Sequence, residues 1–136
     1  MNRILMDILE LIEDATIPNM GHSQSNYKGM RLSSAFQPIF SLSHCRVVGY
    51  EGLIRAFDAQ HQALPVWRIF EQAKTESEIV ELDRLSRALH MHNFTRQAQP
   101  DQWLFLNINP QVIVNGKHYG QFFQDLLEHY GVPPSM

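Results

Sequence analysis

Two extended segments separated by a short connection constrain the fold of this chain more than any other feature. Residues 35–42 (AFQPIFSL) and 46–55 (RVVGYEGLIR) are rich in β-branched and aromatic residues, which favour strands. Because only residues 43–45 connect them, the two segments are predicted to form a hairpin. Pro38 lacks a backbone N–H, which predicts that the first strand lies at an edge or is irregular.

The chain before this hairpin divides into a helical part and an irregular part. Residues 2–15 place isoleucines and leucines at helical spacing with acidic residues between them, which predicts an amphipathic helix. Pro18 is expected to end it, and residues 18–30 hold many turn formers without periodicity, which predicts a linker. We therefore expect an N-terminal helix and linker over 1–30 and one domain over 31–136.

Helices and one further strand follow the hairpin. Pro65 suits the first turn of a helix, and residues 75–78 begin and end with the Thr and Glu of a capping box that opens another. Residues 102–108 (QWLFLNI) are predicted to form the third strand, and a last helix covers about 118–130, with Gly131 as its left-handed cap. After the hairpin the elements alternate as in an α/β protein.

Size and charge exclude several classes of protein. The chain has 136 residues, 44% of them hydrophobic, which is enough for one globular domain with a core but not for two. A formal net charge of −3 argues against nucleic acid as a partner, and no apolar run reaches the roughly 18 residues of a membrane span. An acidic N-terminus argues against export, and Cys45 as the only cysteine excludes an internal disulfide. These features favour a cytoplasmic protein.

Polar side chains stand in two strands where a core would be apolar. Alternation places Glu51, Leu53 and Arg55 on one face of the second strand, and Asn107 on the face of the third strand opposite its leucines. Glu51 and Asn107 offer oxygen atoms that suit a hard cation such as Mg²⁺, and Arg55 offers a forked donor for phosphate. The alternative is that Glu51 and Arg55 form a solvated ion pair and that Asn107 only begins a turn before Pro110.

The ordered set of motifs resembles the EAL-domain family of cyclic-di-GMP phosphodiesterases. The matching residues, in family order and with similar spacing over about residues 35–134, are Gln37-Pro38-Ile39, Gly49-Tyr50-Glu51-Gly52-Leu53 with Arg55, Leu82-Asp83 and Leu106-Asn107. The resemblance implies a TIM-type (β/α) barrel whose first strand is antiparallel to the others. It also implies hydrolysis of cyclic di-GMP to linear pGpG with Mg²⁺ or Mn²⁺.

The resemblance assigns roles to five residues. It implies that Glu51 and Asn107 are metal ligands. It implies that Gln37 and Arg55 line the dinucleotide pocket, with Arg55 near a phosphate, and that Leu53 lies beside the substrate.

Two positions depart from the family pattern. Gly52 stands in place of the signature alanine, and Asn109 stands where a serine is usual. Gly52 is expected to point away from the Glu51 face, so the metal ligand is retained.

A complete barrel of this type has about 250 residues, so the 136 residues predict a partial barrel, the truncated N-terminal part of an EAL-like domain. No complete catalytic set is expected in it, and two functions remain open. The first is the N-terminal part of a phosphodiesterase, inactive by itself. The second is a non-catalytic module that binds nucleotide or docks a partner, with self-association as a homodimer through helix 2–15 and strand 102–108.

Three further expectations concern the burial of single side chains. Trp67 and Trp103 are predicted to lie in the core. Asp83 is predicted to form an ion pair at the surface with Arg84 or Arg87.

Overall fold

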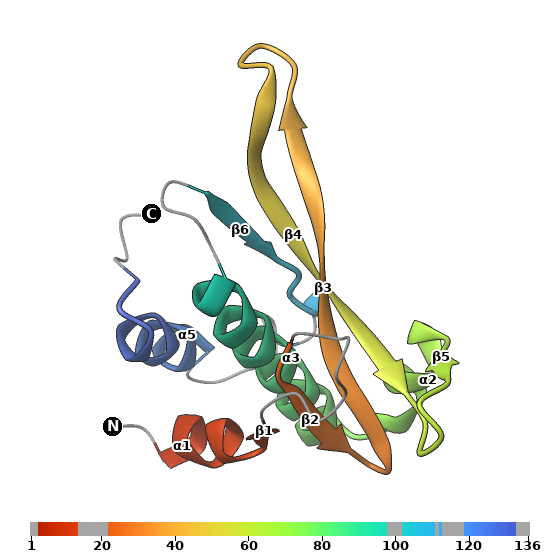
Figure 1. Cartoon of the computed structure of the whole chain (residues 1–136). Helices are drawn as coiled ribbons and strands as arrows, with labels where there is room; N and C mark the ends of the chain where they lie inside the picture. The colour runs from red at the N-terminus through yellow and green to blue at the C-terminus, as the bar shows by residue number, and fades with distance from the viewer. Residues whose placement is uncertain (1–2, 14–21, 98–101, 111, 113–118, 133–136) are drawn as a thin grey trace.

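The computed structural model describes residues 3–13, 22–97, 102–110, 112 and 119–132. The described residues form one mixed sheet with helices packed against it (Figure 1). The helices are α1 (Arg3–Glu10), α2 (Val66–Gln72), α3 (Glu76–Gln97) and α5 (Tyr119–His129). The strands are β1 (Ile12–Glu13), β2 (Gln24–Tyr27), β3 (Met30–Ser41), β4 (Arg46–Phe57), β5 (Ala63–Leu64) and β6 (Trp103–Leu106).

The long strands β3 and β4 form the predicted antiparallel hairpin, whose turn projects beyond the rest of the molecule (Figure 1). Within the described ranges, the pairing of β2 with β3 reaches only residues 30–32 of β3, so Pro38 lies where β3 is an edge strand. The register of the hairpin shifts between Ile39 and Phe40, next to this proline. Both features agree with the missing N–H of Pro38.

A parallel pairing of β4 with β6 follows the hairpin. The register joins Gly49 to Trp103 and Gly52 to Leu106, and the chain between the two strands passes through α2 and α3. Backbones approach closely here, because a Cβ atom on Gly49 would lie 2.6 Å from the Trp103 carbonyl oxygen. An antiparallel first strand followed by a parallel strand–helix–strand unit confirms the predicted start of a TIM-type barrel.

The core lies between the sheet and α3, and it continues to α1 and α5 on the far side of α3. Its most buried apolar side chains come from every layer, and they include Leu5, Leu32, Ala56, Ile69, Leu85, Leu89, Phe122 and Leu126. Because α3 has neighbours on several sides, most of its second half is buried, including polar residues.

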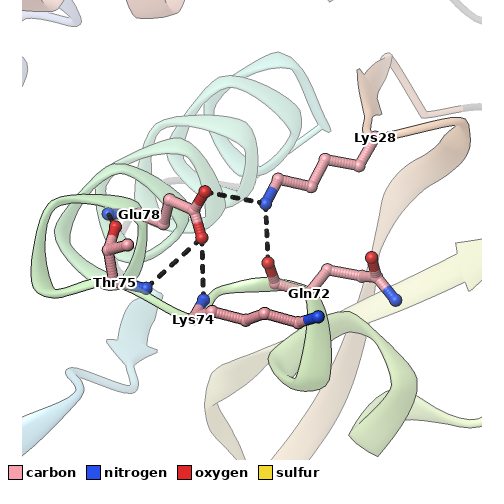
Figure 2. Close-up of polar contacts among 5 residues, drawn as sticks. All are labelled: Lys28, Gln72, Lys74, Thr75 and Glu78. Atoms are coloured by element: carbon pink, nitrogen blue, oxygen red, sulfur yellow. Dashed lines mark hydrogen bonds and ion pairs between the residues drawn. The ribbon is translucent and has the colours of Figure 1, made fainter.

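The capping box at the start of α3 is confirmed, and it ties this helix to the β2–β3 turn. The Glu78 backbone N–H donates to Thr75 Oγ1 over 3.1 Å, and Glu78 Oε2 accepts from the backbone N–H groups of Lys74 and Thr75. Figure 2 shows the second link, in which Lys28 Nζ contacts Glu78 Oε1 at 3.0 Å and donates to the Gln72 carbonyl. The Glu78 carboxylate therefore joins the loop before α3 to the β2–β3 turn.

The start of α2 and the end of α5 follow the predicted signals. Pro65 directly precedes α2. The first backbone N–H groups of a helix have no partner within the helix, so the missing N–H of proline loses no hydrogen bond there. Gly131 follows α5 with φ +68°, and the N–H of Val132 donates to the Leu127 carbonyl over 2.9 Å.

The prediction for the N-terminal region is partly wrong. Helix α1 ends at Glu10 and residues 12–13 join the sheet, so the helix is shorter than the predicted 2–15. Within the predicted linker 18–30, residues 24–27 form β2, a strand whose buried residues include Gln24 and Ser25. Polar residues that are buried leave no hydrophobic alternation, which explains why the pattern did not reveal this strand. Residues 14–21 lie outside the described part.

The two tryptophans are also not where the sequence placed them. Trp67 is 57% exposed and Trp103 is 62% exposed. Trp67 lies on the outer side of α2 beside the Arg68 guanidinium, and Trp103 lies on the face of β6 opposite the helices.

No helix among the described residues is long and apolar enough to cross a bilayer.

Candidate functional site

Glu51 of β4 and Asn107, which directly follows β6, meet on the sheet face opposite the helices. Asn107 Nδ2 donates a 2.9 Å hydrogen bond to Glu51 Oε1. The parallel register pairs Glu51 with Phe105, and alternation puts Asn107 on the same face as Phe105. The sequence predicted that these two side chains, whose oxygen atoms suit a metal ion, share one face of the sheet. The structure brings them together on that face.

The other predicted site residues surround this pair on the same face. Gln37 is the direct antiparallel partner of Glu51 in the hairpin, so the two side chains are neighbours. Leu53 is half-buried and Arg55 is exposed, while the alternate residues Gly52 and Ile54 are buried on the helix side. The ion pair between Glu51 and Arg55 is not formed, because Arg55 Nη1 donates instead to the Ile54 carbonyl over 2.9 Å.

His90 of α3 is the site neighbour that sequence reasoning missed. A Cβ atom on Gly52 would lie 3.0–3.2 Å from His90 side-chain atoms. The imidazole is buried, and its Nδ1 forms a 2.7 Å hydrogen bond with Ser34 Oγ. Burial lowers the pKa of His90 to about 4, with the charges of Arg55 and His22 acting in the same direction. The ring is therefore neutral near pH 7, and the glycine in the Glu-Gly-Leu signature provides the room for it.

Asp83 of α3 is bonded on both carboxylate oxygens, and it is not at the surface as predicted. Its Oδ1 accepts the backbone N–H of Asn109 over 2.9 Å, and its Oδ2 accepts from Arg87 Nε over 2.9 Å. Asp83 and Arg87 are 8% and 1% exposed, whereas Arg84 lies over the Phe122 ring. Packing of α3 against both the sheet and α5 buries an ion pair that the i, i+4 spacing alone would leave at the surface.

A cavity of about 510 Å³ opens beside these residues, between the ends of β4 and β6 and helices α2 and α3. Its lining includes Arg55, Phe70, Asp83, His90, Asn107 and Asn109. A larger hollow of about 760 Å³ lies between α1 and the start of α3 and includes none of the predicted site residues. Three of the predicted site residues, Leu53, Arg55 and Asn107, line the smaller cavity, whereas Glu51 and Gln37 do not, so the cavity adjoins the Glu51–Asn107 pair on the helix side of the sheet.

The donor chemistry of Glu51 and Asn107 fits part of a Mg²⁺ or Mn²⁺ site. A carboxylate and an amide carbonyl are hard oxygen ligands, and the 2.9 Å hydrogen bond shows that both reach one point. Rotation of the Asn107 amide would turn its Oδ1 toward that point. Within the described residues, no three His, Cys, Asp or Glu side chains are grouped so as to hold a metal ion. The pair would therefore supply two ligands of a set that needs more.

The face that carries Glu51 also carries exposed aromatic residues. Trp103 is 62% exposed and Phe105 is 43% exposed, with their ring centroids 5.9 Å apart. In the part of the chain that is described, β6 pairs only with β4, which leaves its other edge open. This face is the one that would line the interior of a barrel.

Comparison with known proteins identifies a family and solved structures with a similar fold. The family model described as "EAL domain" matches residues 23–136. A solved structure described as "Klebsiella pneumoniae BlrP1 with FMN and cyclic diGMP, no metal ions" matches with a TM-score of 0.62 and 17% sequence identity. That match covers 90% of this chain but only 29% of the BlrP1 chain, and at this identity it supports the fold alone. No curated protein matches the chain.

Proposed function

Because the chain belongs to the EAL-domain family, we propose that it is the N-terminal part of a cyclic-di-GMP phosphodiesterase domain. Such a domain hydrolyses one phosphodiester bond of cyclic di-GMP and releases linear pGpG. The observation that carries the proposal is the hydrogen bond between Glu51 and Asn107, which joins a signature residue in β4 to one directly after β6. The structure similar to this chain contains cyclic di-GMP, which agrees with this choice of substrate.

Each site residue has a role in this proposal. Glu51 and Asn107 would hold Mg²⁺ or Mn²⁺, which would supply Lewis-acid chemistry for the phosphate and a water of lowered pKa. Arg55 binds a phosphate through the guanidinium N–H groups that the Ile54 carbonyl does not use. Gln37 and Leu53 contact the nucleotide from the same face of the sheet, Gln37 from β3 directly opposite Glu51 and Leu53 from β4 two residues after it.

We also propose that this chain does not hydrolyse cyclic di-GMP by itself. Among the described residues, Glu51 and Asn107 offer two metal ligands, too few to fix a reactive water between a cation and a phosphate. Binding of the metal ion can therefore be measured in this chain without hydrolysis of cyclic di-GMP.

Manganese titration of the isotope-labelled chain tests the metal site directly. Mn²⁺ is expected to broaden the side-chain amide signal of Asn107 before the signals of other asparagines. Glu51→Gln should abolish the selective broadening, whereas Glu128→Gln, which changes an exposed carboxylate on α5, should leave it intact. Equal broadening in the wild type and in Glu51→Gln would contradict the assignment.

The exposed aromatic face favours a second function, that of a non-catalytic binding module that self-associates. Trp103 and Phe105 present apolar surface beside the open edge of β6, and both features are common where chains pair. Light scattering at micromolar concentration should give a dimer mass, and Trp103→Ser should shift it toward the monomer. A monomer mass of 15.8 kDa for the wild type would contradict self-association.

A cytoplasmic location belongs to the same proposal. Cys45 is a free and exposed cysteine in the hairpin turn. Free exposed thiols are typical of reducing compartments. Labelling of Cys45 by a thiol reagent in intact cells that exclude the reagent would contradict this location.

A further inference from the structure

The segment that follows β6 is held on two sides by two different carboxylates. On the open face of the sheet, the Asn107 side chain donates to Glu51 Oε1 over 2.9 Å. On the helix side, the backbone N–H of Asn109 donates to Asp83 Oδ1 over 2.9 Å. Only Ile108 lies between the two anchored residues, so the backbone there has little freedom to rotate.

The anchor on the helix side is buried and rigidly supported. Arg87 Nε donates to Asp83 Oδ2 over 2.9 Å, and the side chains of both residues are at most 5% exposed. The Arg87 guanidinium also lies over the rings of Phe122 and Phe123 from α5, at 5.4 and 5.6 Å from their centroids. This packing fixes the direction in which Asp83 Oδ1 points.

Both backbone polar groups of Asn109 are used. Its N–H is bound by Asp83, and its carbonyl accepts the N–H of Val112 over 2.9 Å. The residue is therefore set in place from α3 rather than by pairing within the sheet, because β6 ends at Leu106.

We infer that Asp83 is a positioning residue for the Glu51–Asn107 site, acting through the backbone of Asn109. Without the Asp83 acceptor, the chain after β6 loses the contact that directs the Asn107 side chain at Glu51. The inference rests on the proposed function for the metal ligands, but the orientation of Asn107 can be measured without metal. Arg87 serves the same purpose one step further away, by holding the carboxylate in its orientation.

Two matched double variants separate positioning from a general loss of stability. Asp83→Asn/Arg87→Met, the acceptor-retaining variant, removes both charges but keeps an oxygen that can accept the Asn109 N–H. Asp83→Leu/Arg87→Met, the acceptor-free variant, removes both charges and the acceptor, with a side chain of similar size. Removing both charges together avoids leaving one of them buried without its partner.

The first readout needs no metal. In the wild type, Glu51→Gln is expected to shift the Asn107 side-chain amide signals in an NMR spectrum. The same shift is expected in the acceptor-retaining background and is expected to be absent in the acceptor-free background, where hydrogen exchange of the Asn109 amide should also be faster. An equal shift in both backgrounds would overturn the inference.

The second readout is Mn²⁺ affinity. We expect the acceptor-free variant to bind Mn²⁺ at least about tenfold more weakly than the acceptor-retaining variant, the usual effect of losing a residue that orients a ligand. Absence of Mn²⁺ binding in the wild type would refute the proposed metal site, while the Asn107 signals would still decide the positioning role. If the acceptor-free variant does not fold, Asp83→Glu moves the acceptor and keeps the charge, and unchanged Asn107 signals there would overturn the inference.

Discussion

The imidazole of His90 occupies the space that a methyl group on residue 52 would need. The Cβ atom of an alanine at this position would lie 3.0 Å from Cγ of His90, closer than nearly all carbon contacts in proteins. The departure from the family signature at Gly52 therefore has a local steric cause, and it does not alter the face on which Glu51 lies.

Gly52→Ala is expected to destabilise the protein by about 1 kcal/mol, because the buried ring must shift and overpacking has a cost of this order. In a His90→Ala background the same change should be neutral or stabilising, since alanine restricts the unfolded chain more than glycine does. Urea unfolding of the four members of this double-mutant cycle measures the interaction. Equal effects of Gly52→Ala in both backgrounds would show that His90 is not the cause.

The buried imidazole also predicts a dependence of stability on pH. His90 has a pKa of about 4 in the folded state and an ordinary value of 6.5 when unfolded. The unfolded state therefore binds the proton first, and stability is full above pH 6.5 and falls as the pH drops toward 4. At about 1.36 kcal/mol per pKa unit the loss is on the order of 3 kcal/mol.

The difference in unfolding free energy between the wild type and His90→Gln isolates this contribution. It should shrink as the pH falls from neutral toward the folded-state pKa of about 4, because glutamine has no proton to bind. A difference that stays constant over this interval would contradict the assignment.

The capping box predicts a second, separate effect at the start of α3. Thr75→Ala removes the acceptor for the Glu78 N–H and is expected to cost about 1 kcal/mol. The same change at Thr95, which bonds within α3 to the Met91 carbonyl, is the control and should cost less. Thermal unfolding of both variants compares them.

Glu78 should contribute a pH dependence of its own. Hydrogen bonds from the Lys74 and Thr75 backbone N–H groups and from Lys28 lower the pKa of Glu78 below its ordinary 4.5. A lowered pKa means that this stabilisation is present above pH 4.5 and is lost as the pH falls through the folded-state value. The stability difference between the wild type and Glu78→Gln should therefore disappear in acid, as the pH falls from 4.5 through the lowered folded-state pKa.

Catalysis by this chain alone is expected to be absent. With Mg²⁺ or Mn²⁺ and cyclic di-GMP, no pGpG should appear on chromatography, because the proposed site has two metal ligands among the described residues, Glu51 and Asn107. Formation of pGpG that Glu51→Ala abolishes would contradict this expectation.

Local sequence patterns were sufficient to predict the hairpin of β3 and β4 and the common face of Glu51, Arg55 and Asn107. Strand alternation and turn length are local properties, and the paired motif residues were recognisable in order along the chain. The capping box and the glycine after α5 were equally local, because each depends on residues within one turn of a helix.

Packing between distant elements determines which polar residues are buried and what they hold. Gln24 and Ser25 lie in a buried strand, and Asp83 is enclosed with Arg87 between the sheet and α5. His90 meets Gly52, which lies far earlier in the sequence, only because α3 packs across β4. Burial of a polar group depends on partners distant in sequence, and no local pattern records them, whereas the direction of a side chain in a strand is set by its own backbone.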